Sequence, residues 1–174
     1  MRSAHRLFFA LWPSPALRRK LTDESAALVL SSGGKPTPGA NLHVTVVFVG
    51  EQPAQRLDDI LAVGAAVSAP AFTLTFDRAE SWSRSKVLVL PATHTPSELA
   101  KLEERLHVSL LERQIELRRD AYRPHVTLAR KLPRTWPARP IEPFQWHAQE
   151  FVLAESVSEE GGPRYEVRAR WPLA

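Results

Sequence analysis

The chain has 174 residues, no cysteine and a formal net charge of +4. This length can bury a sizeable core, so we expect one domain over residues 1–174. The lack of cysteine excludes disulfides, thiolate metal ligands and a cysteine nucleophile, and it favours a reducing, cytoplasmic location. No stretch approaches the roughly 18 consecutive apolar residues of a membrane span, so the sequence predicts a soluble protein with no membrane partner.

The charge is distributed unevenly along the chain. Residues 113–139 hold eight basic side chains and two acidic ones, whereas residues 142–166 hold six glutamates and one arginine. A polyanion is therefore expected to approach the basic stretch. A solvated surface loop without a ligand fits the same pattern.

The first half of the chain shows alternating strand and helix patterns. The apolar run before Pro13 is too short for a secretory signal and favours a buried strand. Ser14 and Pro15 form a helix start, and Gly33 follows its predicted end. The expected elements are a strand at 6–12, a helix up to about 32, a strand at 42–49 ended by Gly50, and a helix from 57 to about 70.

The second half begins with two strand patterns, at 72–76 and 87–90. A helix follows, for which Thr95 to Glu98 reads as a capping box with proline at its first position. A strand is predicted at 122–129 and an irregular loop at 133–143. The last two strands, at 150–157 and 164–171, flank a Gly-rich turn and suit a hairpin.

This mixed order of strands and helices favours an α+β fold over a doubly wound parallel sheet. Neither GxGxxG nor GxxxxGK[ST] occurs in the chain. A dinucleotide enzyme and a P-loop NTPase are therefore not expected.

A nearly identical tetrapeptide occurs twice, 82 residues apart. His43-Val44-Thr45-Val46 and His125-Val126-Thr127-Leu128 each fall inside a predicted strand. Because residues i and i+2 of a strand share a face, each copy presents an imidazole beside a hydroxyl. One such pair is common in the core of a sheet, but packing alone does not require the same polar pair twice.

Two facing copies would place two imidazoles and two hydroxyls in one cleft. One histidine can then act as a base and the other as an acid near neutral pH, while the threonines donate hydrogen bonds to phosphate oxygens. This combination indicates phosphate-ester chemistry with His43 and His125 as the catalytic residues and Thr45 and Thr127 as substrate-binding residues. A zinc site is the weaker interpretation, because no third ligand accompanies either motif. We expect neither a metal nor a cofactor.

These motifs resemble those of the two-histidine (HxTx) phosphoesterases, in particular the bacterial RNA 2',3'-cyclic phosphodiesterases formerly called 2'-5' RNA ligases. The resemblance covers almost the whole chain. Its main segments are Arg6–Ala10, Asn41–Thr45 with Phe48–Gly50, Arg123–Arg130, and a closing hairpin from Glu155 to Tyr165.

The resemblance implies a bilobal, pseudo-twofold-symmetric α+β fold, with two mainly antiparallel sheets forming a central groove and helices on the outside. It also implies hydrolysis of RNA or small cyclic-nucleotide 2',3'-cyclic phosphates to 2'-phosphates. By that resemblance His43 protonates the leaving 3' oxygen and His125 activates water. The residues alone do not distinguish the two roles.

Arg130 is the further candidate for binding phosphate, since the family pattern also places a basic residue there. Because successive side chains of a strand point to opposite faces, Arg130 should point away from His125 unless the strand ends or bulges near Ala129. We predict that irregularity. The same parity places Phe48 in the core. Trp136 is the one tryptophan considered as a nucleobase platform, and Tyr122 and Arg123 are candidates for the groove edge.

Three alternatives stay open. The first is a 2'-5' RNA ligase or 2',5'-phosphodiesterase, the second is a cyclic phosphodiesterase for small nucleotides, and the third is an RNA-binding module without catalysis. We expect a monomer.

Overall fold

The computed structural model describes residues 2–174. Its strands and α-helices follow one another in an order that starts with a strand and ends with a hairpin. They are β1 (Ala4–Leu11), α1 (Pro15–Ser32), β2 (Lys35–Pro36), β3 (Val44–Pro53), α2 (Leu57–Ala66), β4 (Phe72–Trp82), β5 (Val87–Pro91), α3 (Ser97–Glu112), β6 (His125–Arg130), β7 (Arg139–Ala148), β8 (Glu150–Glu159) and β9 (Gly162–Pro172). Two short 3-10 turns, η1 (Gly39–Asn41) and η2 (Ala54–Arg56), flank β3.

The strands form two antiparallel halves that meet at β3 and β6. Their order is β7-β4-β5-β6-β3-β1-β8-β9, and β2 pairs with β6 outside this path. Strands β3 and β6 pair through one residue pair, Val44 with Val126. The predicted bilobal α+β fold is therefore confirmed, with its two sheets joined where these strands pair. Each half contributes one HxTx strand to the junction.

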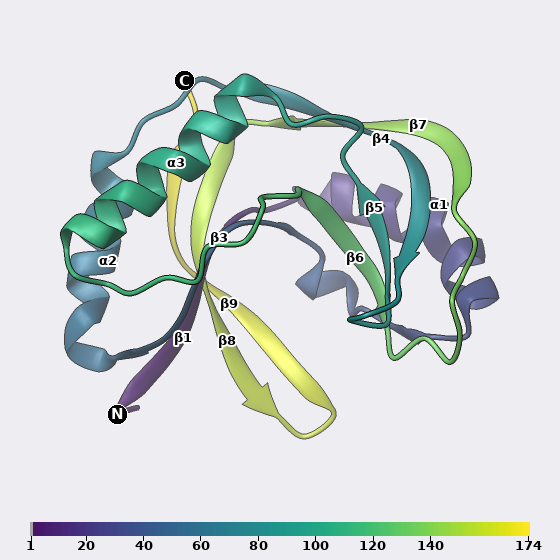
Figure 1. Ribbon diagram of the computed structural model, residues 1–174, viewed down its shortest axis with the longest axis horizontal. Helices are drawn as coiled ribbons and strands as arrows, with labels where there is room; N and C mark the ends of the chain where they lie inside the picture. The colour runs from purple at the N-terminus through teal and green to yellow at the C-terminus, as the bar shows by residue number, and fades with distance from the viewer. Residues whose placement is uncertain (1) are drawn as a thin grey trace.

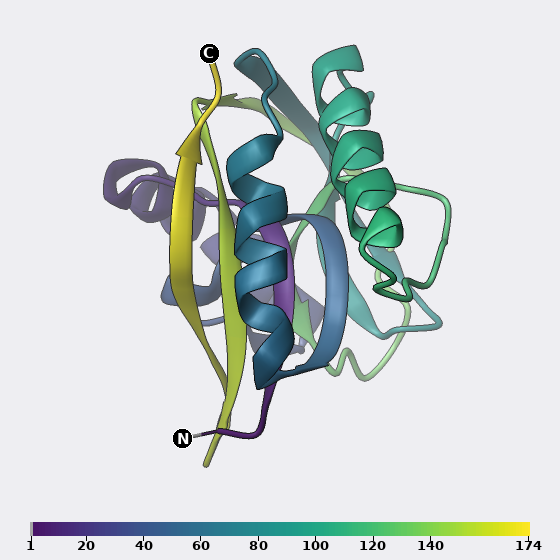
Figure 2. The same cartoon turned by 90° about the vertical axis from the view of Figure 1, so that its left-hand side faces the viewer.

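The helices lie on the outside of the two halves (Figure 1). Helix α2 packs against β8 and β9, α3 packs against α2 and β3, and α1 packs against β6. Figure 2 shows α2 and α3 running side by side over the half that contains β1. Gly64 of α2 faces the ring of Trp171, where a Cβ atom would collide with the indole, so glycine permits this close helix–sheet contact.

The predicted start and end of α1 are confirmed. The Ser14 hydroxyl accepts a hydrogen bond from the backbone N–H of Leu17 at 3.2 Å, and Pro15 follows it. Gly33 ends the helix in the left-handed region, with a φ of 70°.

The predicted capping box of α3 is wrong. Pro96 occupies the N-cap position with extended backbone angles, and no side chain caps the helix there. Thr95 lies one residue too early to reach the first free N–H groups of the helix. The apolar stripe of α3 is as predicted, because Leu99, Leu102, Leu106 and Leu110 are buried.

Two predicted strand boundaries are also wrong. Strand β3 continues past Gly50, which has a φ of 83° and lies at a register shift against β1 instead of ending the strand. Part of the predicted loop at 133–143 is the start of β7, which pairs with β4 from Arg139 onward. Because β7 is an edge strand, it tolerates Pro140 and Pro143 in a way that a central strand would not.

The closing hairpin is confirmed, with Glu159 paired to Gly162 across a two-residue turn. Strand β6 begins at His125, three residues later than predicted. No helix within residues 2–174 combines the length and the apolar content needed to cross a membrane.

Candidate functional site

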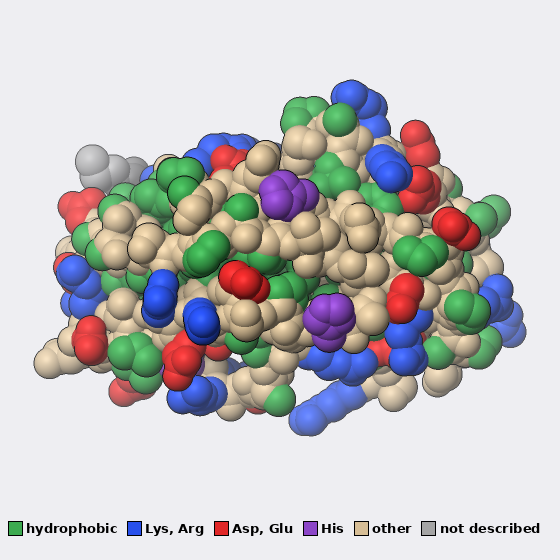
Figure 3. Space-filling view, turned by 90° about the horizontal axis from the view of Figure 1, so that it is seen from above, with side chains coloured by type: hydrophobic (Ala, Val, Ile, Leu, Met, Phe, Trp, Pro, Cys, Tyr) green, Lys and Arg blue, Asp and Glu red, His purple; other side chains and the backbone are tan. Residues whose placement is uncertain are grey.

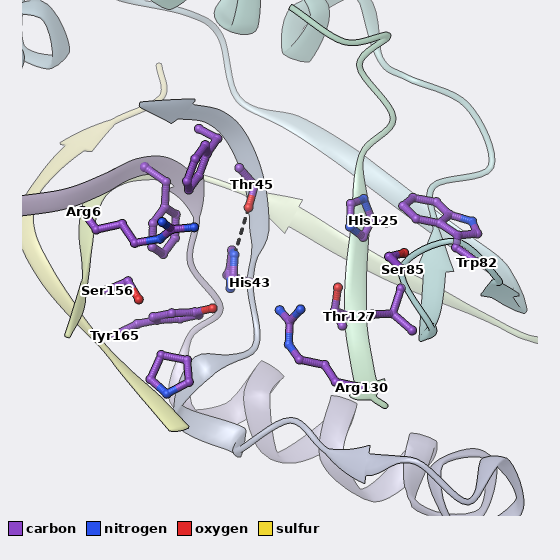
Figure 4. Close-up of a pocket in the computed structure, with 14 residues that line it drawn as sticks. Arg6, His43, Thr45, Trp82, Ser85, His125, Thr127, Arg130, Ser156 and Tyr165 are labelled. Atoms are coloured by element: carbon purple, nitrogen blue, oxygen red, sulfur yellow. Dashed lines mark hydrogen bonds between the residues drawn. The ribbon is translucent and has the colours of Figure 1, made fainter. Parts of the chain in front are cut away.

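The two HxTx motifs lie next to each other because β3 and β6 pair at Val44 and Val126, the residue after each histidine. His43, Thr45, His125 and Thr127 all line one cleft of about 480 Å³ (Figure 4). The structure thus brings together the four residues that the repeated tetrapeptide singles out.

Both imidazoles are held in the same way. The Nδ1–H of His43 donates to the carbonyl oxygen of Asn41, and that of His125 donates to the carbonyl oxygen of Arg123, each at 2.7 Å. A carbonyl oxygen accepts only, so Nδ1 carries the proton and Nε2 is the basic nitrogen of each neutral ring. The Nε2 atom of His43 accepts from the Thr45 hydroxyl at 2.9 Å.

His43 is enclosed by aromatic rings. Its imidazole lies 5.0 Å from Phe8, 5.3 Å from Tyr165 and 5.6 Å from Trp12, measured between ring centroids. The pKa of His43 is lowered from 6.5 to about 4, mainly by burial and to a smaller extent by the charges of Arg130 and His125, while the hydrogen bond to the Asn41 carbonyl opposes the shift. In the free protein His43 is therefore neutral at pH 7.

His125 lies against one aromatic ring, that of Trp82, at a centroid distance of 4.4 Å. Burial again lowers its pKa, with Arg123 and Arg130 acting in the same direction and the hydrogen bond to the Arg123 carbonyl opposing them. Burial and the neighbouring charges therefore favour the neutral form of both histidines.

Arg130 lies in the cleft because β6 is irregular where irregularity was predicted. Thr127 pairs with Val89 and Ala129 with Leu88, so Leu128 is an extra residue opposite β5. The strand then ends at Arg130. The predicted irregularity is confirmed, and the guanidinium points into the cleft between His43 and Thr127 in Figure 4.

The prediction that Phe48 belongs to the core is wrong. Strand β3 has the same irregularity as β6, because Thr45 pairs with Ala10 and Val47 with Phe9, which leaves Val46 as the extra residue. The parity of the strand changes there, and Phe48 turns into the cleft with 47% of its surface exposed. Phe48 and Arg130 each lie five residues after their histidine, so they occupy matching positions in the two halves.

A buried carboxylate organises the side of the cleft around His125. Glu80, only 9% exposed, accepts from the Trp82 indole N–H at 2.8 Å, from Arg123 at 2.6 Å and from Arg78 at 2.5 Å. The Arg123 guanidinium also lies 4.8 Å from the centre of the Trp82 ring. Glu80 thus holds both residues that contact His125 here. Trp82 packs against the imidazole ring, and the Arg123 carbonyl oxygen accepts from the Nδ1–H.

Asn41 plays the matching structural part near His43. Its amide N–H₂ donates to the Pro163 carbonyl at 2.8 Å, and its side-chain oxygen accepts from the Tyr165 N–H at 3.2 Å. These bonds attach β9 to the turn that holds His43. No pattern in the sequence indicated Glu80 or Trp82, and the resemblance included Tyr165 only as part of the closing hairpin, because the proximity of these residues to the motifs arises from strand pairing.

The basic stretch at 113–139 does not form one surface. Arg113 pairs with Asp59, Arg123 pairs with Glu80, and Arg139 lies over the ring of Trp136. Of the lysines and arginines in this stretch, Arg130 is the one that lines the cleft. On the face shown in Figure 3, basic side chains are interspersed with acidic ones.

Trp136 is buried and donates its indole N–H to Ser31 at 3.1 Å, so the suggested platform role is wrong. Of the other histidines, His5 pairs with the buried Glu155 and His147 contacts Thr73. Within residues 2–174, no group of three or more His, Cys, Asp or Glu side chains is arranged to hold a metal ion.

Fold and cleft together define a class of α+β proteins in which two HxTx strands meet at the junction of two antiparallel halves. The chain belongs to the 2'-5' RNA ligase superfamily, whose model matches residues 13–157. The family predicted from the motifs is therefore confirmed.

Two curated relatives are similar along almost their whole length. The RNA 2',3'-cyclic phosphodiesterase of Escherichia coli is 30% identical over 175 residues, covering 99% of each chain. The protein of the same name from Thermus thermophilus is 28% identical and covers 97% of this chain and 90% of its own. The crystal structure of E. coli LigT in its apo form has a TM-score of 0.89 at 28% identity over 99% of each chain.

Proposed function

We propose that this protein hydrolyses 2',3'-cyclic phosphate ends of RNA to 2'-phosphates by acid–base catalysis between His43 and His125. One observation carries the proposal: two imidazoles with identical Nδ1–H anchors line one cleft together with two threonines and an arginine. The names of the E. coli and T. thermophilus relatives support the substrate class. The crystal structure of E. coli LigT complexed with 3'-AMP supports a nucleotide ligand, at a TM-score of 0.87 and 29% identity.

In the proposed reaction His125 takes a proton from water while the water oxygen forms a bond to phosphorus. The bond from phosphorus to the 3' oxygen breaks, and His43 donates a proton to that oxygen. One water molecule is consumed, and a 2'-phosphate and a 3'-hydroxyl are formed. The direction of proton flow follows the family resemblance, since the two anchored rings are chemically alike.

The low pKa of His43 is compatible with its role as the acid only when substrate is bound. The negative charge of the cyclic phosphate offsets Arg130 and favours the imidazolium, so substrate binding raises the pKa of His43 from about 4. In the transition state Arg130 and the hydroxyls of Thr45 and Thr127 hold the charge on the non-bridging oxygens.

Phe48 offers an aromatic face at the same cleft, close to Arg6, whose guanidinium carbon lies 4.9 Å from the ring centre. An exposed aromatic ring of this kind can stack on any of the four nucleobases, because each base has a flat π-face. We therefore assign Phe48 to the terminal nucleobase.

The test is product analysis with the wild type and with His43→Ala and His125→Ala. A short RNA with a 2',3'-cyclic phosphate should yield only a 2'-phosphate end. Each variant should lose at least about a thousandfold in kcat while RNA affinity is largely kept. Unchanged turnover in either variant would end the catalytic assignment. Exclusive cleavage or joining of 2',5' linkages would instead favour the phosphodiesterase or ligase alternative.

A further inference from the structure

A second pocket of about 420 Å³ adjoins the cleft on the side of α3. It shares Thr45, Phe48, Trp82 and His125 with the cleft, so these four residues form the boundary between the two spaces. Its remaining lining comes from α3, from the segment between α3 and β6, and from the strand residues Val46 and Val47. Nothing in the proposed reaction uses this pocket.

The pocket contains a buried histidine that the reaction does not need. His107 is 5% exposed, lies on α3 and faces the pocket. Within residues 2–174 neither nitrogen of its ring has a hydrogen-bond partner. Among the described residues, the buried side-chain atoms that lack a partner are Arg18 Nε and Thr37 Oγ1, so the ring nitrogens of His107 reach the open space of the pocket and are free to bind a ligand there.

Glu103 lies one helical turn before His107 and lines the same pocket. Together they offer a carboxylate acceptor and an imidazole that can donate or accept. Tyr122 lines the same pocket. Burial and, to a smaller extent, the charge of Glu103 raise the pKa of its hydroxyl above the usual range. That hydroxyl donates to the Thr45 carbonyl at 3.0 Å, so the segment that closes the pocket is attached to the first HxTx strand.

The walls and charges of the pocket suit an uncharged planar group. Phe48 presents its exposed ring at the boundary with the cleft. Glu103 and Asp120 balance Arg118 and Arg123, and Arg123 is already bound to Glu80. A phosphate would gain little from this balance, whereas a nucleobase has apolar faces and a hydrogen-bonding edge.

We propose that this pocket receives the nucleobase of the nucleotide that precedes the cyclic end, with His107 and Glu103 hydrogen-bonding to its edge. The inference rests on the proposed function. The cleft of about 480 Å³ is itself the size of a site for one small ligand, so the terminal nucleotide fills it and the pocket is left for its neighbour. The preferred substrate is then an RNA end of at least two nucleotides, and a free cyclic mononucleotide is a weaker one.

The experiment compares steady-state kinetics on a nucleoside 2',3'-cyclic phosphate and on a dinucleotide with the same cyclic end. In the wild type the dinucleotide should have a KM lower by on the order of tenfold, as expected for one further base contact. His107→Ala should remove this difference and leave the KM of the mononucleotide unchanged. His94→Ala, at an exposed histidine outside both pockets, is the matched control and should behave as the wild type.

A wild type with no preference for the dinucleotide would overturn the inference, as would His107→Ala raising both KM values equally. Glu103→Ala, at a half-buried position of the same helix, supplies a second variant should His107→Ala not fold, and it should also reduce the preference. If neither substrate is hydrolysed by the wild type, the proposed function fails. Binding of the 3'-phosphorylated dinucleotide then decides the inference, and an affinity unaffected by either substitution overturns it.

Discussion

Acidification should destabilise this protein through the protonation of His43. The pKa of His43 falls from 6.5 to about 4 on folding. Protonating His43 therefore costs about 3 kcal/mol more in the folded protein than in the unfolded chain. Because the pKa is lower in the folded state, the stabilisation is complete above pH 6.5 and is lost as the pH falls toward 4. Between pH 7.5 and pH 5, His43 alone should lower the free energy of unfolding by about 2 kcal/mol.

Urea denaturation at these two pH values measures the effect. His43→Gln removes the titrating group, so its free energy of unfolding should change by about 2 kcal/mol less than that of the wild type over the same window. The pKa of His125 is also lowered, which adds a further loss in both proteins. The lowered carboxyl pKa values of Glu80 and Glu155 act only in more acidic solution.

His94→Gln is the control, because this exposed histidine should leave the full pH dependence in place. Inorganic phosphate, which favours the imidazolium in the cleft, should reduce the loss at pH 5 more in the wild type than in His43→Gln, which retains only His125. The same pH dependence in the wild type and in His43→Gln would refute the reasoning.

Arg130→Ala should lower kcat/KM for a cyclic phosphate end by about 100-fold, and Arg130→Lys should retain part of the activity; wild-type kinetics for Arg130→Ala would remove this residue from the site. Glu80→Ala should lower kcat/KM about tenfold and the free energy of unfolding by about 2 kcal/mol, because Trp82 and Arg123 lose their shared acceptor. A stable Glu80→Ala with unchanged kcat/KM contradicts a positioning role. Activity after dialysis against EDTA should equal that before it, and a loss that a divalent metal restores would argue for metal-assisted hydrolysis.

The location of the site could be predicted because its signal is local. In a strand the i and i+2 side chains share a face, so each HxTx motif defines its own half of the cleft without knowledge of the fold. The helix start at Ser14 and the closing hairpin were predictable for the same reason, since caps and turns depend on a few neighbouring residues.

Other features depend on contacts between distant segments. Whether Phe48 and Arg130 face the cleft is decided by one extra residue in each strand, Val46 and Leu128, and such bulges depend on the register with β1 and β5. Parity alone predicted the wrong face for Phe48. It predicted the right face for Arg130 only once an irregularity was assumed.

The sequence by itself indicated the side chains to which we assign the chemistry: two histidines, each with its threonine, in a repeated strand pattern. Only the tertiary structure decided the burial, the hydrogen-bond partners and the pKa values of those side chains. The rings that bury His43, the Glu80 carboxylate behind His125 and the unpaired imidazole of His107 come from elements far apart in the chain. The pKa values and the second pocket arise from burial and from charges brought close by folding, which no local pattern encodes.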